Sequence, residues 1–139
     1  MSTPDPAYRR PIDLKHGRVD LAFGAGGQAM AQLIAELFAR AFANDYLARG
    51  DDAAVLPALT AGERLVLATD AHVVSPLFFP GGDIGSLSVH GTINDLAVMG
   101  ARPLYLAASF ILEEGFALAE LARIVDSMAT AARAAGVAV

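Results

Sequence analysis

Cysteine and tryptophan are absent from this 139-residue chain, and charged residues make up only 18% of it. Without cysteine the chain can form no disulfide, no thiolate metal site and no cysteine nucleophile of its own. No apolar run reaches the roughly 18 residues of a membrane span, and the N-terminus lacks the apolar core of a signal peptide. The net charge of -5 comes with no basic run, so neither nucleic acid nor a membrane surface is an expected partner. We expect a cytoplasmic protein.

What the chain has in abundance is apolar residues, at 55% of the sequence. That fraction argues against disorder, and the length suits one domain with one core. It is also high for a domain that stands alone in water, so we expect another domain or subunit to cover part of the surface. Residues 1–13 are polar and hold three prolines, which predicts a flexible tail before a domain that occupies residues 14–139.

Apolar spacing predicts the secondary structure of this domain. Two helices follow from apolar residues at offsets of three and four, one over residues 30–42 and one over 118–132, with Gly136 as the expected C-terminal cap of the second. Short apolar runs predict strands over residues 21–23, 64–69, 104–112 and 137–139. The last of these begins directly after a helix cap, which indicates the front part of a longer protein.

The most informative stretch is F-F-P-G-G-D-I-G-S-L-S-V-H-G-T-I-N-D-L-A-V-M-G-A-R-P, residues 78–103. Asp83 is a good N-cap, and Gly100 with Pro103 supplies a stop, so a helix is expected from about Ile84 to Met99. Little of this helix is charged, which predicts that it is mostly buried. An acid within it, Asp95, must then be paired with a donor or an arginine, or bound to a metal.

A glycine-rich loop, Gly24-Ala25-Gly26-Gly27, leads into the first expected helix. Free backbone N–H groups at a helix N-terminus attract anions, and the helix dipole adds to the attraction. The loop matches neither G-x-x-x-x-G-K-[ST] nor G-x-G-x-x-G. A flexible entry turn is therefore an equally good interpretation.

Two further acids, Asp52 and Asp70, stand next to apolar strand segments. Together with Asp95 they would supply hard oxygen ligands of the kind that suits Mg²⁺ bridging to phosphate, although acids at strand ends are ordinarily solvated. His72 could contact phosphate, but a hydrogen-bonded or exposed histidine is the more common case. Asn94 could bind nucleotide or cap a neighbouring group.

Four segments in this order resemble the HypE family of hydrogenase maturation proteins: G-A-G-G-Q-A-M, G-D-D-A-A-V-L, A-T-D-A-H-V-V-S-P-L-F-F-P-G-G-D-I-G and G-T-I-N-D-L-A-V-M-G-A-R-P-L-Y-L. That family belongs to an ATP-binding superfamily with aminoimidazole ribonucleotide synthetase, selenophosphate synthetase and thiamine monophosphate kinase. The resemblance covers about residues 14–139. The segment P-L-F-F-P-G-G-D-I-G is its most HypE-specific part.

The resemblance implies a PurM-like N-terminal domain of the α+β class, with a mixed sheet that packs on helices and pairs with the sheet of a second subunit. It also implies ATP and Mg²⁺ as cofactors. Asp52, Asp70 and Asp95 would hold the metal, and Gly24, Gly26, Gly27 and Asn94 would bind ATP and its phosphates.

HypE proteins use ATP to dehydrate a carboxamide on the sulfur of their own C-terminal cysteine. The thiocyanate that forms supplies cyanide to the iron of nickel-iron hydrogenase. The resemblance therefore implies three partners: a second copy of the chain, the carbamoyltransferase HypF and the HypC–HypD iron scaffold. The acceptor cysteine and a C-terminal domain are absent here, so no catalytic residue is assigned and this piece alone is expected to be inactive.

Two other functions stay open. One is a phosphotransferase of the same superfamily, such as a thiamine monophosphate kinase, against which P-L-F-F-P-G-G-D-I-G argues. The other is a module, without catalysis of its own, for dimerisation and for docking other maturation factors.

Overall fold

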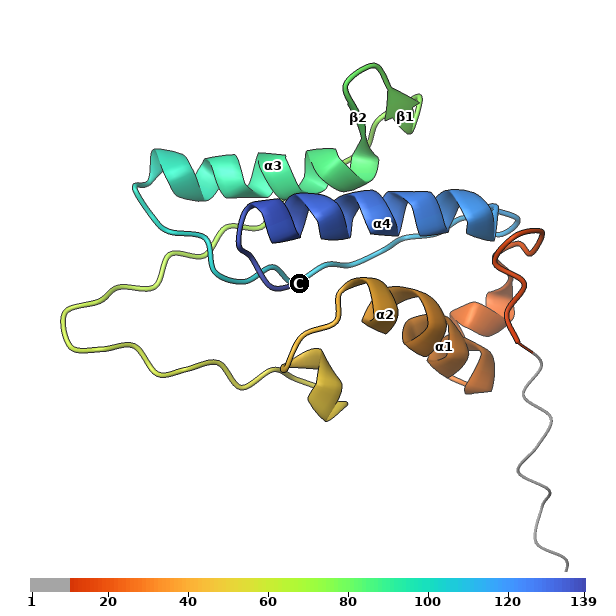
Figure 1. Cartoon of the computed structure of the whole chain (residues 1–139), viewed down its shortest axis with the longest axis horizontal. Helices are drawn as coiled ribbons and strands as arrows, with labels where there is room; N and C mark the ends of the chain where they lie inside the picture. The colour runs from red at the N-terminus through yellow and green to blue at the C-terminus, as the bar shows by residue number, and fades with distance from the viewer. Residues whose placement is uncertain (1–10) are drawn as a thin grey trace, which may run out of the picture.

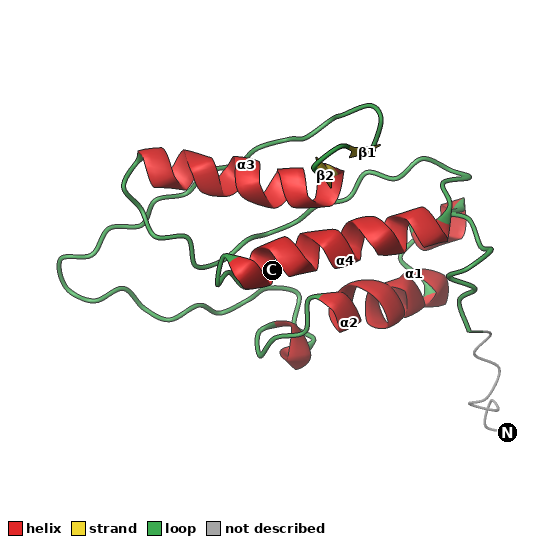
Figure 2. Ribbon diagram, turned by 45° about the horizontal axis from the view of Figure 1, so that its top comes forward, coloured by secondary structure: helices red, strands yellow, loops and turns green. Residues whose placement is uncertain are grey.

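Three helical layers dominate the computed structural model, which describes residues 11–139 (Figure 1). The central layer is α4; α3 lies on one side of it, and a helix made of α1, a π-helical turn η2 and α2 lies on the other. Long loops connect these layers (Figure 2). In chain order the elements are η1 (Leu21–Phe23), α1 (Gln28–Leu33), η2 (Ile34–Phe38), α2 (Ala39–Ala41), η3 (Leu47–Arg49), β1 (Phe78–Phe79), β2 (Gly82–Asp83), α3 (Ile84–Val98) and α4 (Leu118–Ala134).

Helix α4 carries most of the core. Its apolar residues recur at helical spacing, and eight of its residues are buried. Leu121 and Val125 are at most 1% exposed. The backbone leaves the helix at Gly136, where φ is 69°, a value that glycine adopts without strain. The predicted helix and its terminal glycine are confirmed.

Helix α3 begins where its sequence predicts. The Asp83 carboxylate accepts hydrogen bonds from the backbone N–H groups of Gly85 (2.7 Å) and Ser86 (3.1 Å), while the Ser86 hydroxyl lies 3.1 Å from the Asp83 backbone nitrogen. This reciprocal capping box satisfies groups that every helix start leaves without an intrahelical partner. The β1–β2 hairpin, with Phe78 opposite Asp83, leads directly into it.

Helices α3 and α4 touch backbone to backbone. A Cβ atom built on Gly85 would overlap the carbonyl oxygen of Ile124, so any side chain larger than hydrogen would push the two helices apart. Near the same crossing, the Arg123 guanidinium lies 4.0 Å from the centre of the Phe78 ring, a cation–π contact that ties α4 to the hairpin.

The helix predicted over residues 30–42 is confirmed, and it begins two residues earlier, at Gln28. Leu33 and Leu37 are buried against the core that α4 provides. The middle turn, η2, is π-helical rather than α-helical, a feature that apolar periodicity did not predict.

The predicted strands are where expectation and structure differ. Residues 21–23 form a 3-10 turn, because the Asp20 carboxylate caps them through the backbone N–H of Ala22. Residues 64–69 and 104–112 form no strand, and residues 137–139 contribute only one parallel bridge, Ala138 with Tyr105. In the described part of the chain the sheet has only β1 and β2. A strand requires a neighbour for its N–H and C=O groups. Among the described residues, segment 64–69 pairs with no strand, and segments 104–112 and 137–139 meet only at this bridge.

The α+β class is thus confirmed, with helices and a small antiparallel sheet, while the mixed sheet is not formed by residues 11–139 alone. Of the predicted tail, residues 1–10 lie outside the described residues. Beyond them the chain is anchored: the backbone N–H of Ile12 donates to the Glu36 carboxylate (3.3 Å), and the Asp13 carboxylate accepts from the N–H groups of Lys15 and His16.

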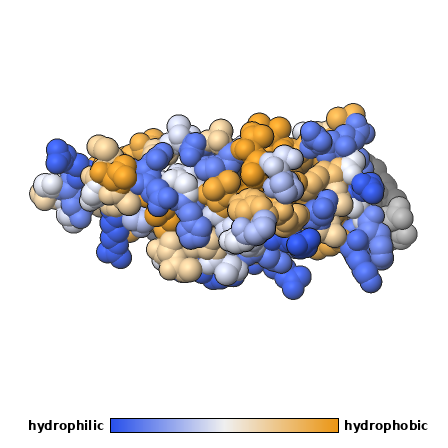
Figure 3. Space-filling model, turned by 90° about the horizontal axis from the view of Figure 1, so that it is seen from above, coloured by the Kyte–Doolittle hydropathy of each residue, from blue (hydrophilic) through white to orange (hydrophobic). Residues whose placement is uncertain are grey.

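Large apolar side chains remain exposed, as the composition suggested. Leu67 is 87% exposed, Val73 98% and Ile111 99%. Apolar patches also interrupt the polar surface in Figure 3. In the described residues no helix is long and apolar enough to cross a membrane.

Candidate functional site

Asp70 and His72 form a pair at the end of the extended segment that follows residue 50. The His72 Nε2 atom lies 3.2 Å from Asp70 Oδ2, and the second carboxylate oxygen, Oδ1, accepts a hydrogen bond from the backbone N–H of Ala71 (2.8 Å). The His72 side chain is 15% exposed, whereas that of Asp70 is 40% exposed. The histidine is therefore packed while the carboxylate still reaches solvent.

The His72 ring packs against helix α3 at Gly91. A Cβ atom at Gly91 would lie 2.5 Å from Nε2, too close for both to stay in place. The sequence favoured an exposed or hydrogen-bonded histidine; in the structure the His72 ring instead packs against α3, within ion-pair distance of Asp70. Gly91 was not singled out from the sequence, although a glycine inside a helical pattern is a signal for close packing.

Asp95 and Asn94 lie on the exposed side of α3, one turn beyond Gly91. The expectation that Asp95 is buried, and so must be paired, is wrong for this chain: α3 buries Gly85, Val89 and Leu96, while Asn94 and Asp95 are exposed.

The apolar character of α3 does not come from full burial. Between its buried positions, the hydroxyls of Ser88 and Thr92 donate to the carbonyls of Gly85 (2.8 Å) and Ser88 (2.9 Å) in the preceding turn. Their hydrogen bonds are satisfied within the helix, which leaves this face low in charge although it is partly open.

Asp52 is exposed in the extended segment, away from any regular element. Across residues 11–139 no three His, Cys, Asp or Glu side chains gather in an arrangement that could hold a metal. Mg²⁺, however, usually keeps several waters and takes only one or two carboxylates plus substrate phosphates. Asp52, Asp70 and Asp95 are all exposed carboxylates.

The glycine-rich loop is open. Gly24 donates its N–H to the Leu21 carbonyl (3.1 Å), and Gly26 adopts a φ of 74°. Gly27 is the N-cap of α1 and provides no side-chain hydrogen bond to the first turn. No heavy atom outside the local chain lies within 4 Å of where a Cβ would stand on Gly26 or Gly27. The loop and the start of α1 are exposed.

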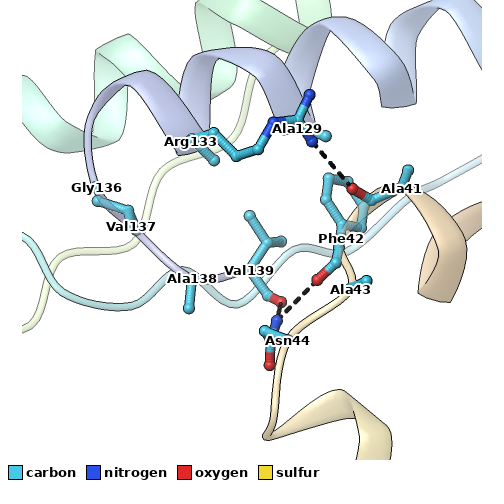
Figure 4. A pocket seen from close by; sticks show the side chains of 11 residues that line it. Ala41, Phe42, Ala43, Asn44, Ala129, Arg133, Gly136, Val137, Ala138 and Val139 are labelled. Carbon is cyan, nitrogen blue, oxygen red and sulfur yellow. Dashed lines mark hydrogen bonds between the residues drawn. The ribbon is translucent and has the colours of Figure 1, made fainter.

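A pocket of about 330 Å³ lies where α2, the end of α4 and the C-terminal residues meet (Figure 4). The Asn44 amide donates to the carbonyls of Phe42 and Val139 (2.8 Å each), and Arg133 Nη1 lies 3.4 Å from the Ala41 carbonyl. These contacts join segments that are distant in sequence. Asn44 was not predicted from the sequence to have this role. No predicted site residue lines this pocket.

Beside it, the hydroxyls of Tyr46 and Tyr105 lie 3.1 Å apart. That hydrogen bond raises the pKa of Tyr105 above its ordinary value, with burial as a smaller cause. The contact links the turn before η3 to the chain after α3, so it is a structural junction.

The order and packing of these helices, together with the small antiparallel hairpin, agree with a PurM-like α+β domain. Residues 50–139 match the family model described as AIR synthase related protein, N-terminal domain. The chain belongs to this family.

Individual relatives confirm the resemblance to HypE. The chain is 70% identical over 130 residues to the carbamoyl dehydratase HypE of Cupriavidus necator, a match that covers 94% of this chain and 37% of that protein. It is 53% identical to the Escherichia coli carbamoyl dehydratase HypE, over 87% of this chain and 37% of the relative. The chain thus spans little more than a third of the relatives it matches.

Solved structures give the same result. A crystal structure of the hydrogenase maturation protein HypE in complex with ATP matches with a TM-score of 0.81 and 52% identity, over 86% of this chain and 35% of that one. A crystal structure of Escherichia coli HypE matches with a TM-score of 0.74 and 51% identity, over 79% of this chain and 35% of that one.

Proposed function

We propose that this chain is the N-terminal ATP- and metal-binding part of a carbamoyl dehydratase. The observation that carries the proposal is 70% identity to a HypE carbamoyl dehydratase across 94% of the chain. The similar structure that contains ATP supports nucleotide binding. The complete protein would convert the S-carboxamide of a C-terminal cysteine to a thiocyanate, which supplies cyanide for the iron of nickel-iron hydrogenase.

The reaction requires ATP because an amide oxygen is a poor leaving group. Transfer of the γ-phosphoryl group to the carboxamide oxygen makes that oxygen leave as phosphate, while the nitrogen loses its protons and the C≡N bond forms. Substrate, ATP and products balance as cysteine S-carboxamide plus ATP giving cysteine thiocyanate, ADP, phosphate and a proton. In such a transfer the protein mainly positions the groups and stabilises charge.

We assign roles to this chain's own residues accordingly. The backbone N–H groups of Gly24, Gly26 and Gly27 would contact the ATP phosphates at the start of α1, and Asn94 would contact the nucleotide from α3. Asp52, Asp70 and Asp95 would hold Mg²⁺, which neutralises charge on the phosphates when bound. The exposure of these carboxylates supports this assignment, because each has free oxygens to offer.

A second copy of the chain is the partner we propose for its extended segments. Leu65, Leu67 and Val73 are exposed on a segment whose backbone pairs with no strand within residues 11–139. Pairing with the same segment of another copy would bury these side chains and complete a mixed sheet. HypF and the HypC–HypD scaffold are the proposed partners of the complete protein, in line with its similarity to HypE.

The test joins this chain to the C-terminal two thirds of the Cupriavidus necator relative, carbamoylates the terminal cysteine, and follows loss of one water by mass spectrometry with ADP release. Asp52→Asn, Asp70→Asn and Asp95→Asn should each lower turnover by about 10²-fold or more, a typical cost of removing one group that stabilises transition-state charge. Asp51→Asn is the matched control and should have a smaller effect.

Circular dichroism should show the fold unchanged in all four variants, since these acids are exposed. Equal and mild losses at the four positions would contradict the metal assignment. A stable phosphorylated product in place of the dehydrated one would favour a phosphotransferase instead.

A further inference from the structure

We propose that His72 is a positioning residue that fixes the Asp70 carboxylate against helix α3, and that Gly91 is the position on the helix that makes room for it. The inference rests on the proposed function, because it gives a purpose to the contact only if Asp70 is a metal ligand. The new roles are those of His72 and Gly91; Asp70 and the glycine-rich loop keep the roles proposed above.

The first observation is the contrast in exposure within the pair. His72 Nε2 lies 3.2 Å from Asp70 Oδ2, with the imidazole 15% exposed and the carboxylate 40% exposed. The Ala71 N–H occupies one position on the other oxygen, Oδ1. Each carboxylate oxygen can accept about two hydrogen bonds or ligands, so each keeps an unused acceptor position toward solvent. The contacts with Ala71 and His72 thus orient the Asp70 carboxylate, and its remaining acceptor positions face solvent.

The second observation is the space at Gly91. This glycine sits in the interior of α3, where glycine is the least favourable residue after proline. A Cβ there would come within 2.5 Å of Nε2, 3.3 Å of Cε1 and 3.5 Å of Cδ2 of His72. The imidazole thus occupies the volume that any other residue at position 91 would fill. That contact explains why a helix interior has a glycine at this place.

The third observation is that sheet pairing does not hold Asp70 in place. The segment before it, residues 64–69, has no strand partner among the described residues, so sheet pairing does not fix it. The His72 contact places Asp70 next to α3. Asp95 lies four residues after Gly91, on the same side of the helix and one turn along. One helix therefore carries Asp95 directly and Asp70 through His72.

Partners that orient metal ligands are usually worth 10- to 100-fold in metal affinity. His72 is suited to that task because its Nε2 lies 3.2 Å from the Asp70 carboxylate, on a ring that packing against Gly91 holds in place.

The experiment measures Mn²⁺ affinity, as a paramagnetic substitute for Mg²⁺, by electron paramagnetic resonance on the 139-residue chain. His72→Leu fills the space without donating, and Gly91→Ala displaces the ring while favouring the helix. Both should weaken Mn²⁺ binding by about 10- to 100-fold. His72→Gln retains a terminal N–H donor and should recover most of the affinity. His90→Leu, an exposed histidine on the same helix, is the matched control and should have no effect.

A second measurement, by NMR and without metal, tests the contact between His72 and Gly91 directly. In the wild-type chain, NMR should give a nuclear Overhauser effect between the His72 ring and the Gly91 α-protons. In Gly91→Ala this signal should vanish, and the Ala71 amide should exchange faster with solvent than in the wild-type chain. Circular dichroism confirms that α3 is retained.

The outcomes separate the two proposals. Weaker binding in Asp70→Asn with unchanged binding in His72→Leu would overturn the positioning role and leave Asp70 as a ligand. Equal binding, or none, in both wild type and Asp70→Asn would overturn Asp70 as a ligand and the metal-directed purpose of the contact. Absence of the Overhauser effect in the wild-type chain would overturn the contact itself.

Discussion

The packed helices and the extended segments of this chain are both rich in apolar residues, but they differ in how far those side chains are buried. Helix α4 buries Leu121 and Val125 almost completely, whereas Leu67 and Ile111, in segments predicted as strands, are 87% and 99% exposed. A helix satisfies its own backbone hydrogen bonds and needs only a surface to pack on. A strand also needs a neighbouring strand. The difference teaches that the described residues complete the helical layers but not the sheet that the sequence predicted.

The largest expected effect tests this contrast in stability. Leu121→Ala should lower the free energy of unfolding by about 2–5 kcal/mol, because it removes buried methyl groups and leaves a cavity under α3. Leu67→Ala is the matched control and should stay within about 0.5 kcal/mol of wild type. Urea unfolding followed by circular dichroism at low protein concentration measures both. Similar losses at the two positions would mean that the 64–69 segment is packed in solution.

A second prediction concerns self-association. Light scattering at micromolar concentration should detect a dimer, because exposed leucines and valines on the extended segment gain about 1.5–3 kcal/mol each when fully buried. Leu67→Glu should therefore raise the dimer dissociation constant about tenfold or more.

The control for that measurement is Val98→Glu, which places the same charge on an apolar residue of α3 that is 84% exposed. It should leave association unchanged if the extended segment forms the interface. A monomeric wild-type chain at these concentrations would argue against sheet pairing between copies.

The smallest expected effect compares a local hydrogen bond in each region. Asp83→Ala removes the cap of α3 and should lower the unfolding free energy by about 0.5–2 kcal/mol. Glu63→Ala removes a similar contact in the extended region, where the Glu63 carboxylate accepts from the Thr60 N–H at 2.8 Å. That change should leave stability unaltered, since the turn is exposed. Thermal unfolding at neutral pH distinguishes the two, and equal shifts would show that the turn is part of the folded core.

The helices could be predicted from the sequence because their signals are local. Asp83, Gly100 and Gly136 mark helix ends through groups only a few residues away, and α3 and α4 end within two residues of where the pattern placed them. The strands could not be predicted in the same way. The apolar run at residues 64–69 indicates a preference for strand structure, but it does not indicate whether a neighbouring strand is present to pair with it.

The site shows the same division. The sequence indicated which residue types could bind a metal and phosphate, and the resemblance to HypE indicated where to look. It could not show that Asp95 lies on an open face, because burial of α3 depends on what covers its far side. The contact between His72 and Gly91 joins positions 19 residues apart, through a space left by a missing side chain, which no spacing rule detects.

The absence of a side chain at Gly85 has a mechanical consequence. With backbone against backbone at Ile124, helices α3 and α4 have no compressible layer of side chains between them at that point. They should therefore respond to force as a single lever, with the Gly85 crossing as its fixed point. A displacement of α4 should therefore carry α3, and Asp95 on it, in the same direction.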